Sequence, residues 1–283
     1  VIDHHKSRPE GGKERSMPPK IQRSLATTVR AASVMIVAFF TSAAHAAEVR
    51  VLSAAAMQSV FKDVSDDFQR TTGYNMIIHY GTIGAVNEWT MAGEEADLII
   101  GSSQSMLTLV KARKISARSL TPICRTGIGV VVAKGIELDV KSVEDFTRAL
   151  ISTKAVVYAD PARGGAAGIH VAKVIAQLGL TEQLKPKIRL GAGGDITEVT
   201  LGLGPSALGI TQISEIADKP KAQLVGPLPE ELQNYTVFVA GVPANAPQSE
   251  GTAALLKFLR SPKVIAVVKA KGMKDFGSDG GSE

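Results

Sequence analysis

The sequence predicts an α/β protein in which helices cover parallel-rich sheets. Short apolar segments alternate with amphipathic segments along most of the chain, an order typical of repeated strand–helix–strand units. Turns made of small residues join the two kinds of segment. Aromatic residues make up only 5% of the chain, which suits closely packed layers of strands and helices.

The first part of the chain repeats one pattern three times: an apolar strand, a small-residue turn and an amphipathic helix. The expected strands are 49–52, 75–80 and 96–100. The turns are 53–56, 81–84 and 101–103. The helices include 57–71, a segment through Val86 and Trp89, and a segment through Met106 and Leu109.

A second strand–helix series begins after a long apolar strand at 126–133. Ser142 and Asp145 have the spacing of a helix N-cap pair. Further strands are expected at 155–158, 188–190, 207–211 and 235–242. Helices are expected from 169 onward, through Val199 and Leu203, and twice near the C-terminus.

Residues 1–46 are expected to lie outside this fold. Residues 1–16 read as upstream sequence, and Met17 as the natural start. Basic residues, an apolar run at 31–40 and Ala44-His45-Ala46 follow, the pattern of a secretory signal cleaved after Ala46. The alternative is a membrane anchor, for which the apolar run is short. We therefore expect a periplasmic protein.

Charge and cysteine content exclude several classes of function. Residues 1–46 carry seven basic and three acidic residues, and so most of the formal net charge of +5. The remainder is nearly neutral and has no basic stripe, so no nucleic-acid partner is expected. Cys124 is the single cysteine, which we interpret as a buried small residue; a catalytic thiol is the alternative. No cluster of residues has metal-ligand spacing, and we expect neither a metal nor a cofactor.

The segment 155–170 carries the strongest functional signal. A buried strand ends at Asp160-Pro161, a turn with Arg163 and Gly165 follows, and His170 lies in the opening of the next helix. Bare backbone N–H groups and the positive end of a helix suit a small anion. An ordinary strand-to-helix turn is the alternative. Similar turns recur at the carboxyl ends of other strands, where open parallel sheets bind ligands, so we expect them to converge on one cleft.

A series of short motifs, in this order, resembles the periplasmic molybdate-binding proteins of ABC transporters. The motifs are Ser53-Ala54-Ala55-Ala56-Met57, Tyr80-Gly81-Thr82, Ala96-Asp97-Leu98, Ala159-Asp160-Pro161, Ala167-Gly168 and Phe258-Leu259-Arg260-Ser261-Pro262 with Lys271-Gly272-Met273. The resemblance implies a type II periplasmic-binding-protein fold. One lobe would comprise 47–127 and 238–283, and the other 128–237. Crossing strands near 126–133 and 235–242 would form the hinge. It also implies an ABC permease as partner, and we expect a monomer.

The family holds its oxyanion with two serine hydroxyls, a tyrosine hydroxyl and backbone N–H groups. At the positions that match the three hydroxyls, this sequence has Ala56, Ile83 and Gln212. The resemblance leaves the backbone donors at Ala167 and Ile196. Each lost hydroxyl donor costs roughly 1–3 kcal/mol in a dry site, which disfavours molybdate.

A side branch of this family is closer still. Its patterns match Ala159–His170, Gln212–Ile216 and Val225–Pro229, and bacterial aconitate isomerases are similar to it. This resemblance raises an organic polycarboxylate as the ligand, or even as a substrate.

Side chains that would select such a ligand have structural alternatives. Arg163 can fork onto a carboxylate or remain a solvated loop residue. His170 can donate to a carboxylate, move a proton or cap its helix. Tyr80 and Thr82 can offer hydroxyls to the ligand or simply pack against their neighbours. Ser53 is a further candidate for the binding site. Gln212 can bond a carboxylate oxygen.

Two functions follow from these residues. The first is a solute-binding protein that captures a small anion, an oxyanion or more readily an organic polycarboxylate, for an ABC transporter. The second is an aconitate-isomerase-like enzyme on the same fold, in which His170 or Tyr80 would move the proton and Arg163 would hold a carboxylate.

Overall fold

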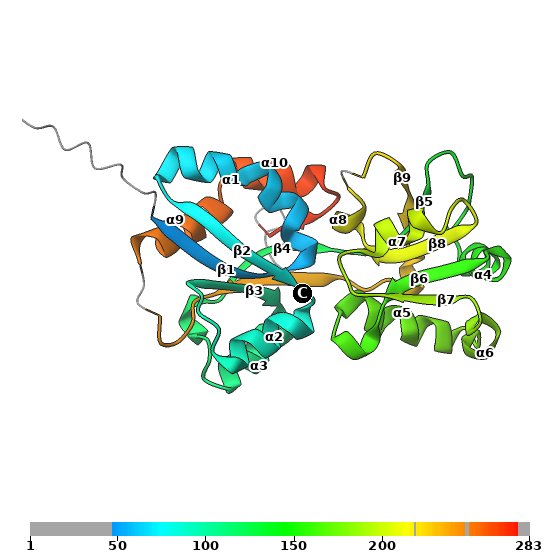
Figure 1. The fold of residues 1–283 in the computed structure, drawn as a ribbon, viewed down its shortest axis with the longest axis horizontal. Helices are drawn as coiled ribbons and strands as arrows, with labels where there is room; N and C mark the ends of the chain where they lie inside the picture. The colour runs from blue at the N-terminus through cyan, green and yellow to red at the C-terminus, as the bar shows by residue number, and fades with distance from the viewer. Residues whose placement is uncertain (1–46, 218, 247–248, 277–283) are drawn as a thin grey trace, which may run out of the picture. The chain divides into compact units, whose positions relative to one another are not determined.

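The computed structural model describes residues 47–217, 219–246 and 249–276, which belong to one compact unit. The predictions for residues 1–46, including the export signal and its cleavage site, lie outside the described residues. Two β-sheets, each covered by helices, make up the described chain (Figure 1). Within these ranges no helix is long and apolar enough to cross a membrane.

The first sheet has six strands in the order β11-β4-β10-β3-β1-β2. They are β1 (Glu48–Ala54), β2 (Asn75–Gly81), β3 (Leu98–Ser102), β4 (Thr121–Thr126), β10 (Thr236–Gly241) and β11 (Lys274–Asp275). β1 runs parallel to β2 and β3, whereas β10 and β11 run antiparallel to their neighbours. The sheet is therefore mixed, and segments far apart in the sequence complete it.

Helices cover both faces of the first sheet. One face carries the short helix η1 (Ala55–Met57), α1 (Gln58–Thr72), α9 (Glu250–Leu259) and α10 (Pro262–Ala270), and the other carries α2 (Ile83–Ala92) and α3 (Ser103–Lys111). A 3-10 turn, η2 (Ala117–Ser119), leads into β4. We call this sheet with its helices lobe 1.

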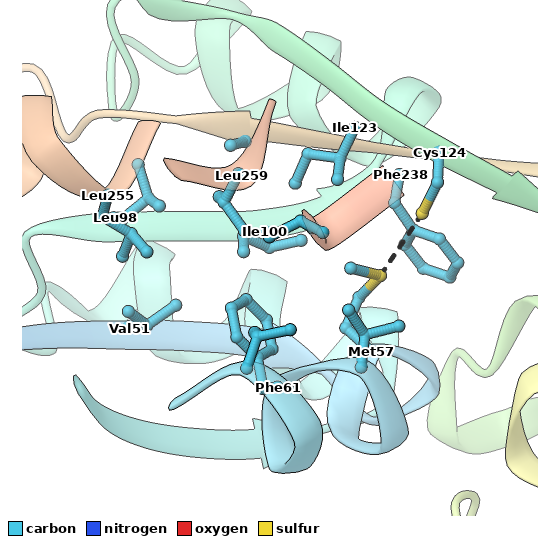
Figure 2. Packing of buried hydrophobic residues seen from close by; sticks show 14 of the residues in the cluster. Val51, Met57, Phe61, Leu98, Ile100, Ile123, Cys124, Phe238, Leu255 and Leu259 are labelled. Atoms are coloured by element: carbon cyan, nitrogen blue, oxygen red, sulfur yellow. Dashed lines mark hydrogen bonds between the residues drawn. The ribbon is translucent and has the colours of Figure 1, made fainter. Parts of the chain in front are cut away.

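The larger core of lobe 1 lies between the sheet and α1, α9 and α10 (Figure 2). Phe61 of α1 and Leu255 of α9 are fully buried there. Cys124 lies in the same core, with its Sγ 3.6 Å from Sδ of Met57. The interpretation of Cys124 as a buried residue is confirmed, and burial raises the pKa of its thiol.

The second sheet has five strands in the order β7-β6-β8-β5-β9. They are β5 (Ile128–Ala133), β6 (Ala155–Ala159), β7 (Ile188–Gly191), β8 (Ala207–Gln212) and β9 (Ala222–Pro227). β6 runs parallel to β7 and β8, and β5 runs antiparallel to β8 and β9. This sheet is also mixed.

Helices again lie on both faces. One face carries α4 (Val143–Ser152), α5 (Ala166–Gln177) and α6 (Thr181–Leu184), and the other carries α7 (Ile196–Gly202). The remaining short elements are η3 (Pro161–Arg163), α8 (Ile213–Ile216) and η4 (Glu230–Leu232). The predicted cap at Ser142 is present, because its side chain accepts from the Asp145 N–H at 3.1 Å. We call this sheet with its helices lobe 2.

The chain passes between the lobes twice. It leaves lobe 1 at Gly127, which separates β4 from β5, and it returns through residues 228–235. Gln233 ties the two passages together: its Oε1 accepts from the Ile128 N–H at 2.8 Å, and its Nε2 donates to the Ile128 carbonyl at 2.9 Å. Neither expected crossing strand pairs with both sheets: β5 pairs only with strands of the second sheet, and β10 pairs only with strands of the first.

Candidate functional site

Turns from both lobes meet around one small pocket. From lobe 1 come the residues that follow β1 and β2, and from lobe 2 come the turns before α5 and α7 and the end of β8. The residues lining the pocket are Ala54, Ala55, Ala56, Gly81, Thr82, Ile83, Ala159, Gly165, Ala166, Ala167, Gly193, Gly194, Thr211, Gln212, Glu215 and Phe238. The predicted convergence of small-residue turns is therefore present in the structure.

Helix starts supply most of this lining. The first residues of η1, α2 and α5 all contribute to it. No side chain caps η1 or α5, whose N-cap residues are Ala54 and Gly165. Because the first N–H groups of a helix have no partner within the helix, they point donors and a partial positive charge at the pocket.

Close backbone packing brings α5 to this place. A Cβ on Gly168 would lie 2.0 Å from the carbonyl oxygen of Ala159, so only glycine lets the first turn of α5 sit directly on the end of β6. This contact explains the small-residue motif at 165–168. It also sets the helix start at the carboxyl end of a central strand, where ligands bind in open α/β sheets.

The two lobes touch directly beside the pocket. Thr82 Oγ1 donates to the Arg163 carbonyl at 2.7 Å, and the Gly84 N–H donates to the Gly164 carbonyl at 3.1 Å. On another side, Ser59 Oγ donates to the Ser214 carbonyl at 3.0 Å. These bonds hold the lobes in a closed arrangement.

Few polar side chains line the pocket. Gln212 is buried, and its Nε2 donates to Thr236 Oγ1 at 3.0 Å. The Thr211 hydroxyl donates to the carboxylate of Glu215. Desolvation by burial raises the pKa of Glu215 to about 6, while hydrogen bonds from Thr211 and the Gln212 backbone lower it and the charges of Asp195 and Glu198 raise it.

The pocket is small, with a volume of about 40 Å³. A second cavity of about 200 Å³ shares the walls Ala55, Gly194 and Glu215 with it. Lys62 and Lys219 line this second cavity, which we call the outer cavity. One carboxylate or a small oxyanion fits the pocket, and a longer acid has to reach into the outer cavity.

Of the residues predicted for the site, about half line the pocket: Ala56, Thr82, Ile83, Gly165, Ala167 and Gln212. Ala56, Ile83 and Gln212, which stand where the resembling family has hydroxyls, are all in the lining, so the pocket carries no hydroxyl at these three places. The Thr82 hydroxyl is engaged, because it accepts from the Ala85 N–H at 3.0 Å and donates to Arg163.

The other predicted residues lie outside the lining. Arg163 has an exposed side chain, and it is its carbonyl that reaches lobe 1. His170 has its Nε2 2.7 Å from the Leu232 carbonyl, a contact within lobe 2. Ser53 is buried in β1 and donates to the Ala54 carbonyl at 3.2 Å.

Tyr80 and Ile196 complete this second group. Tyr80 is half-buried against the core of lobe 1, and burial raises the pKa of its hydroxyl. Ile196 is buried against Gly191, with its side chain in the small core behind β6. Ile196, whose N–H group was expected to be a donor, is the first residue of α7. The residue before it, Asp195, has a carboxylate that accepts from the N–H groups of Ala192 and Gly193.

The sequence interpretation missed Glu215 and Thr211 as parts of the lining, and it expected the glycine-rich turn before α7 at the cleft without naming Gly193 and Gly194 as site residues. The sequence could have indicated Glu215 by its position, three residues after Gln212 at the start of a helix. The side chain of a residue in that position points toward the N-terminal end of the helix, where the preceding strand ends. The pattern Gln212–Ile216 contained it, but only the one-turn helix α8 brings its side chain to the pocket.

Known proteins match nearly all of the described chain. Residues 49–274 match the family model of bacterial extracellular solute-binding proteins. Aconitate isomerase from a Pseudomonas species is 22% identical over 231 residues, which cover 79% of this chain and 86% of that protein. The molybdate-binding protein ModA of Azotobacter vinelandii is 25% identical over 244 residues, which cover 81% of this chain and 91% of that protein.

A solved structure gives the same result for the fold. The periplasmic molybdate-binding protein of Azotobacter vinelandii matches with a TM-score of 0.66 at 17% identity, over 80% of this chain and 98% of that one. The predicted resemblance and the type II periplasmic-binding-protein fold are thus confirmed.

Proposed function

Because the chain belongs to the bacterial extracellular solute-binding proteins, we propose that it captures a small anion in the periplasm and delivers it to the permease of an ABC transporter. The observation that carries this proposal is the set of helix starts from two lobes around one pocket. Uncapped N–H groups and helix dipoles favour a negative charge there. Lobe closure over the ligand would give the permease a closed form to recognise.

The lining favours an organic acid over molybdate or tungstate. Ala56 and Ile83 offer no polar side-chain atom, and the hydroxyls of Thr82 and Thr211 are already engaged. The amide of Gln212 gives one of its two N–H donors to Thr236, and the second can bond a carboxylate oxygen. The name of the relative aconitate isomerase points to the same ligand class.

A polycarboxylate would bind with its charges in two places. One carboxylate fits the pocket at the helix starts, and the rest of the molecule extends past Glu215 into the outer cavity. Lys62 and Lys219 line that cavity and can attract a second carboxylate.

Calorimetric titration of the purified protein with molybdate, tungstate, citrate and trans-aconitate tests this proposal. We expect the two organic acids to bind more tightly than the two oxyanions. Absence of binding by all four refutes anion capture. The same sample, incubated with trans-aconitate and assayed for the cis isomer, tests the isomerase alternative, in which we expect no turnover because His170 and Tyr80 lie outside the lining.

A further inference from the structure

Glu215 stands apart from the rest of the pocket because it carries a negative charge when ionised. Among the described residues that line the pocket, it alone has an ionisable side chain. The remaining lining consists of small, apolar and neutral polar residues together with helix starts. A carboxylate in a site built for anions needs an explanation of its own.

The surroundings hold this carboxylate in the wall between the pocket and the outer cavity. The Thr211 hydroxyl donates to one of its oxygens. Thr197 Oγ1 donates at 3.2 Å to the backbone carbonyl of Glu215, which fixes the one-turn helix α8. The side chain is therefore positioned beside any group that enters the pocket.

The charged groups around Glu215 come from two sides. Asp195 and Glu198 lie on the side of α7 and add negative potential. Lys62 of α1 and Lys219 line the outer cavity, and Lys219 is ion-paired with Glu198. The other elements that pack extensively against α8 are η1, β5, β8 and β9, which contain no charged residue. The turn after α10 also reaches α8, because a Cβ on Gly272 would lie 2.7 Å from Ile213 Cγ2. Lys271, next to this glycine, is buried and ion-paired with Asp63 of α1. No described cationic residue lines the pocket itself.

An ionised Glu215 and an anion in the pocket would place two like charges side by side with little water between them. Two carboxylates in this relation share one proton. We propose that the pocket takes up its anion together with one proton, which lies between Glu215 and the ligand; this inference rests on the proposed function. The proton comes from the solvent and balances the added negative charge.

In the protein without ligand, Glu215 already binds a proton more readily than an ordinary glutamate does. Burial raises the pKa of Glu215 to about 6, within reach of mildly acidic surroundings. A protonated Glu215 donates an O–H bond to an anionic oxygen, and an ionised Glu215 accepts one from a ligand hydroxyl. While Glu215 is ionised, the pocket therefore favours acids that themselves carry a proton or a hydroxyl group. A fully deprotonated oxyanion binds only after the protein has taken a proton from water.

Calorimetric titration with trans-aconitate and with molybdate, in two buffers with different heats of ionisation, measures the proton uptake directly. We expect about half a proton to be taken up per anion bound at pH 6, where half of the free Glu215 is already protonated, and close to one between about pH 7 and about pH 8. Over the upper range the affinity should fall by up to about tenfold per pH unit. Binding without proton uptake, and with an affinity that does not change with pH, overturns this inference and leaves anion capture standing. No binding of either anion at any pH overturns this inference, and if citrate and tungstate also fail to bind, anion capture is refuted as well.

The variant Glu215→Gln separates the role of the proton from the role of the side chain. Thr211 can still donate to the amide oxygen, so the fold is retained, which circular dichroism checks. We expect affinity that no longer depends on pH and no proton uptake. Glu182→Gln, an exposed change on α6, serves as the matched control and keeps the wild-type pH dependence. A wild-type pH dependence in Glu215→Gln overturns the assignment to this residue.

Discussion

Replacing Gly84 with alanine should hold the two lobes apart without damaging either of them. A Cβ at this position would lie 2.6 Å from the Arg163 carbonyl oxygen and 2.8 Å from Gly164 Cα, both in lobe 2. Ordinary contact needs about 3.5 Å, so the lobes must separate by about 1 Å. Gly84 lies in α2, where alanine suits the helix, and lobe 1 should keep its stability.

The cost to closure follows from the bonds that this separation breaks. A separation of about 1 Å breaks both the bond from Thr82 Oγ1 to the Arg163 carbonyl and the bond from the Gly84 N–H to the Gly164 carbonyl. At about 1 kcal/mol each, their loss weakens the closed form by about 2 kcal/mol. If only the closed form holds the ligand, anion affinity falls by about 30-fold.

Calorimetric titration with trans-aconitate measures this loss, and small-angle X-ray scattering with the ligand shows whether the lobes close. Gly202→Ala is the matched control: it adds a Cβ with nothing within 4 Å at the end of α7, and wild-type affinity is expected. A Gly84→Ala protein that binds as tightly as the wild type and closes as fully would refute the reasoning.

Three further outcomes are expected. His170→Ala loses the contact with the Leu232 carbonyl. Urea unfolding should therefore show a free energy of unfolding lower by about 1 kcal/mol, and the anion affinity should stay unchanged. A loss of affinity would show that His170 belongs to the binding site. Cys124 should not react with a thiol reagent in the native protein and should react in full in urea, because it is buried and its pKa is raised; rapid native labelling would contradict this burial. For Glu215, the folded pKa of about 6 lies above the ordinary 4.5, so its contribution to stability is complete below about pH 4.5 and is lost as pH rises through 6. Glu215→Gln should therefore gain about 2 kcal/mol of stability relative to the wild type by pH 7, measured by urea unfolding at several pH values; a pH-independent difference would show that the carboxyl titrates normally.

Hydrophobic periodicity predicted most of the strand–helix order, because buried strands and amphipathic helices leave plain patterns. It missed β4, where Pro122 interrupts the pattern, β9, which ends at Pro227, and the two-residue strand β11. Pro122 sits next to the register shift between β4 and β10, and Pro227 ends β9 at the edge of its sheet, both places where a missing N–H is tolerated.

The site was predictable where the backbone makes it and less so where side chains do. Small residues such as Ala56 and Gly165 have little choice of orientation, so the turns that carry them could be assigned to the pocket. Arg163 and His170 have long or pivoting side chains, and neighbouring turns decide where these point. Glu215 depends on a one-turn helix, which is too short for a periodic signal.

The place of β10 in the first sheet has a consequence for how the molecule is made. All strands of the second sheet lie between residues 128 and 227, so that half can assemble from one continuous stretch of nascent chain. β3 and β4 are joined only by β10, which starts at Thr236. Since distant pairings are slow to form, the first sheet stays open until the chain beyond Thr236 has been synthesised, and it closes after the second sheet can already have formed.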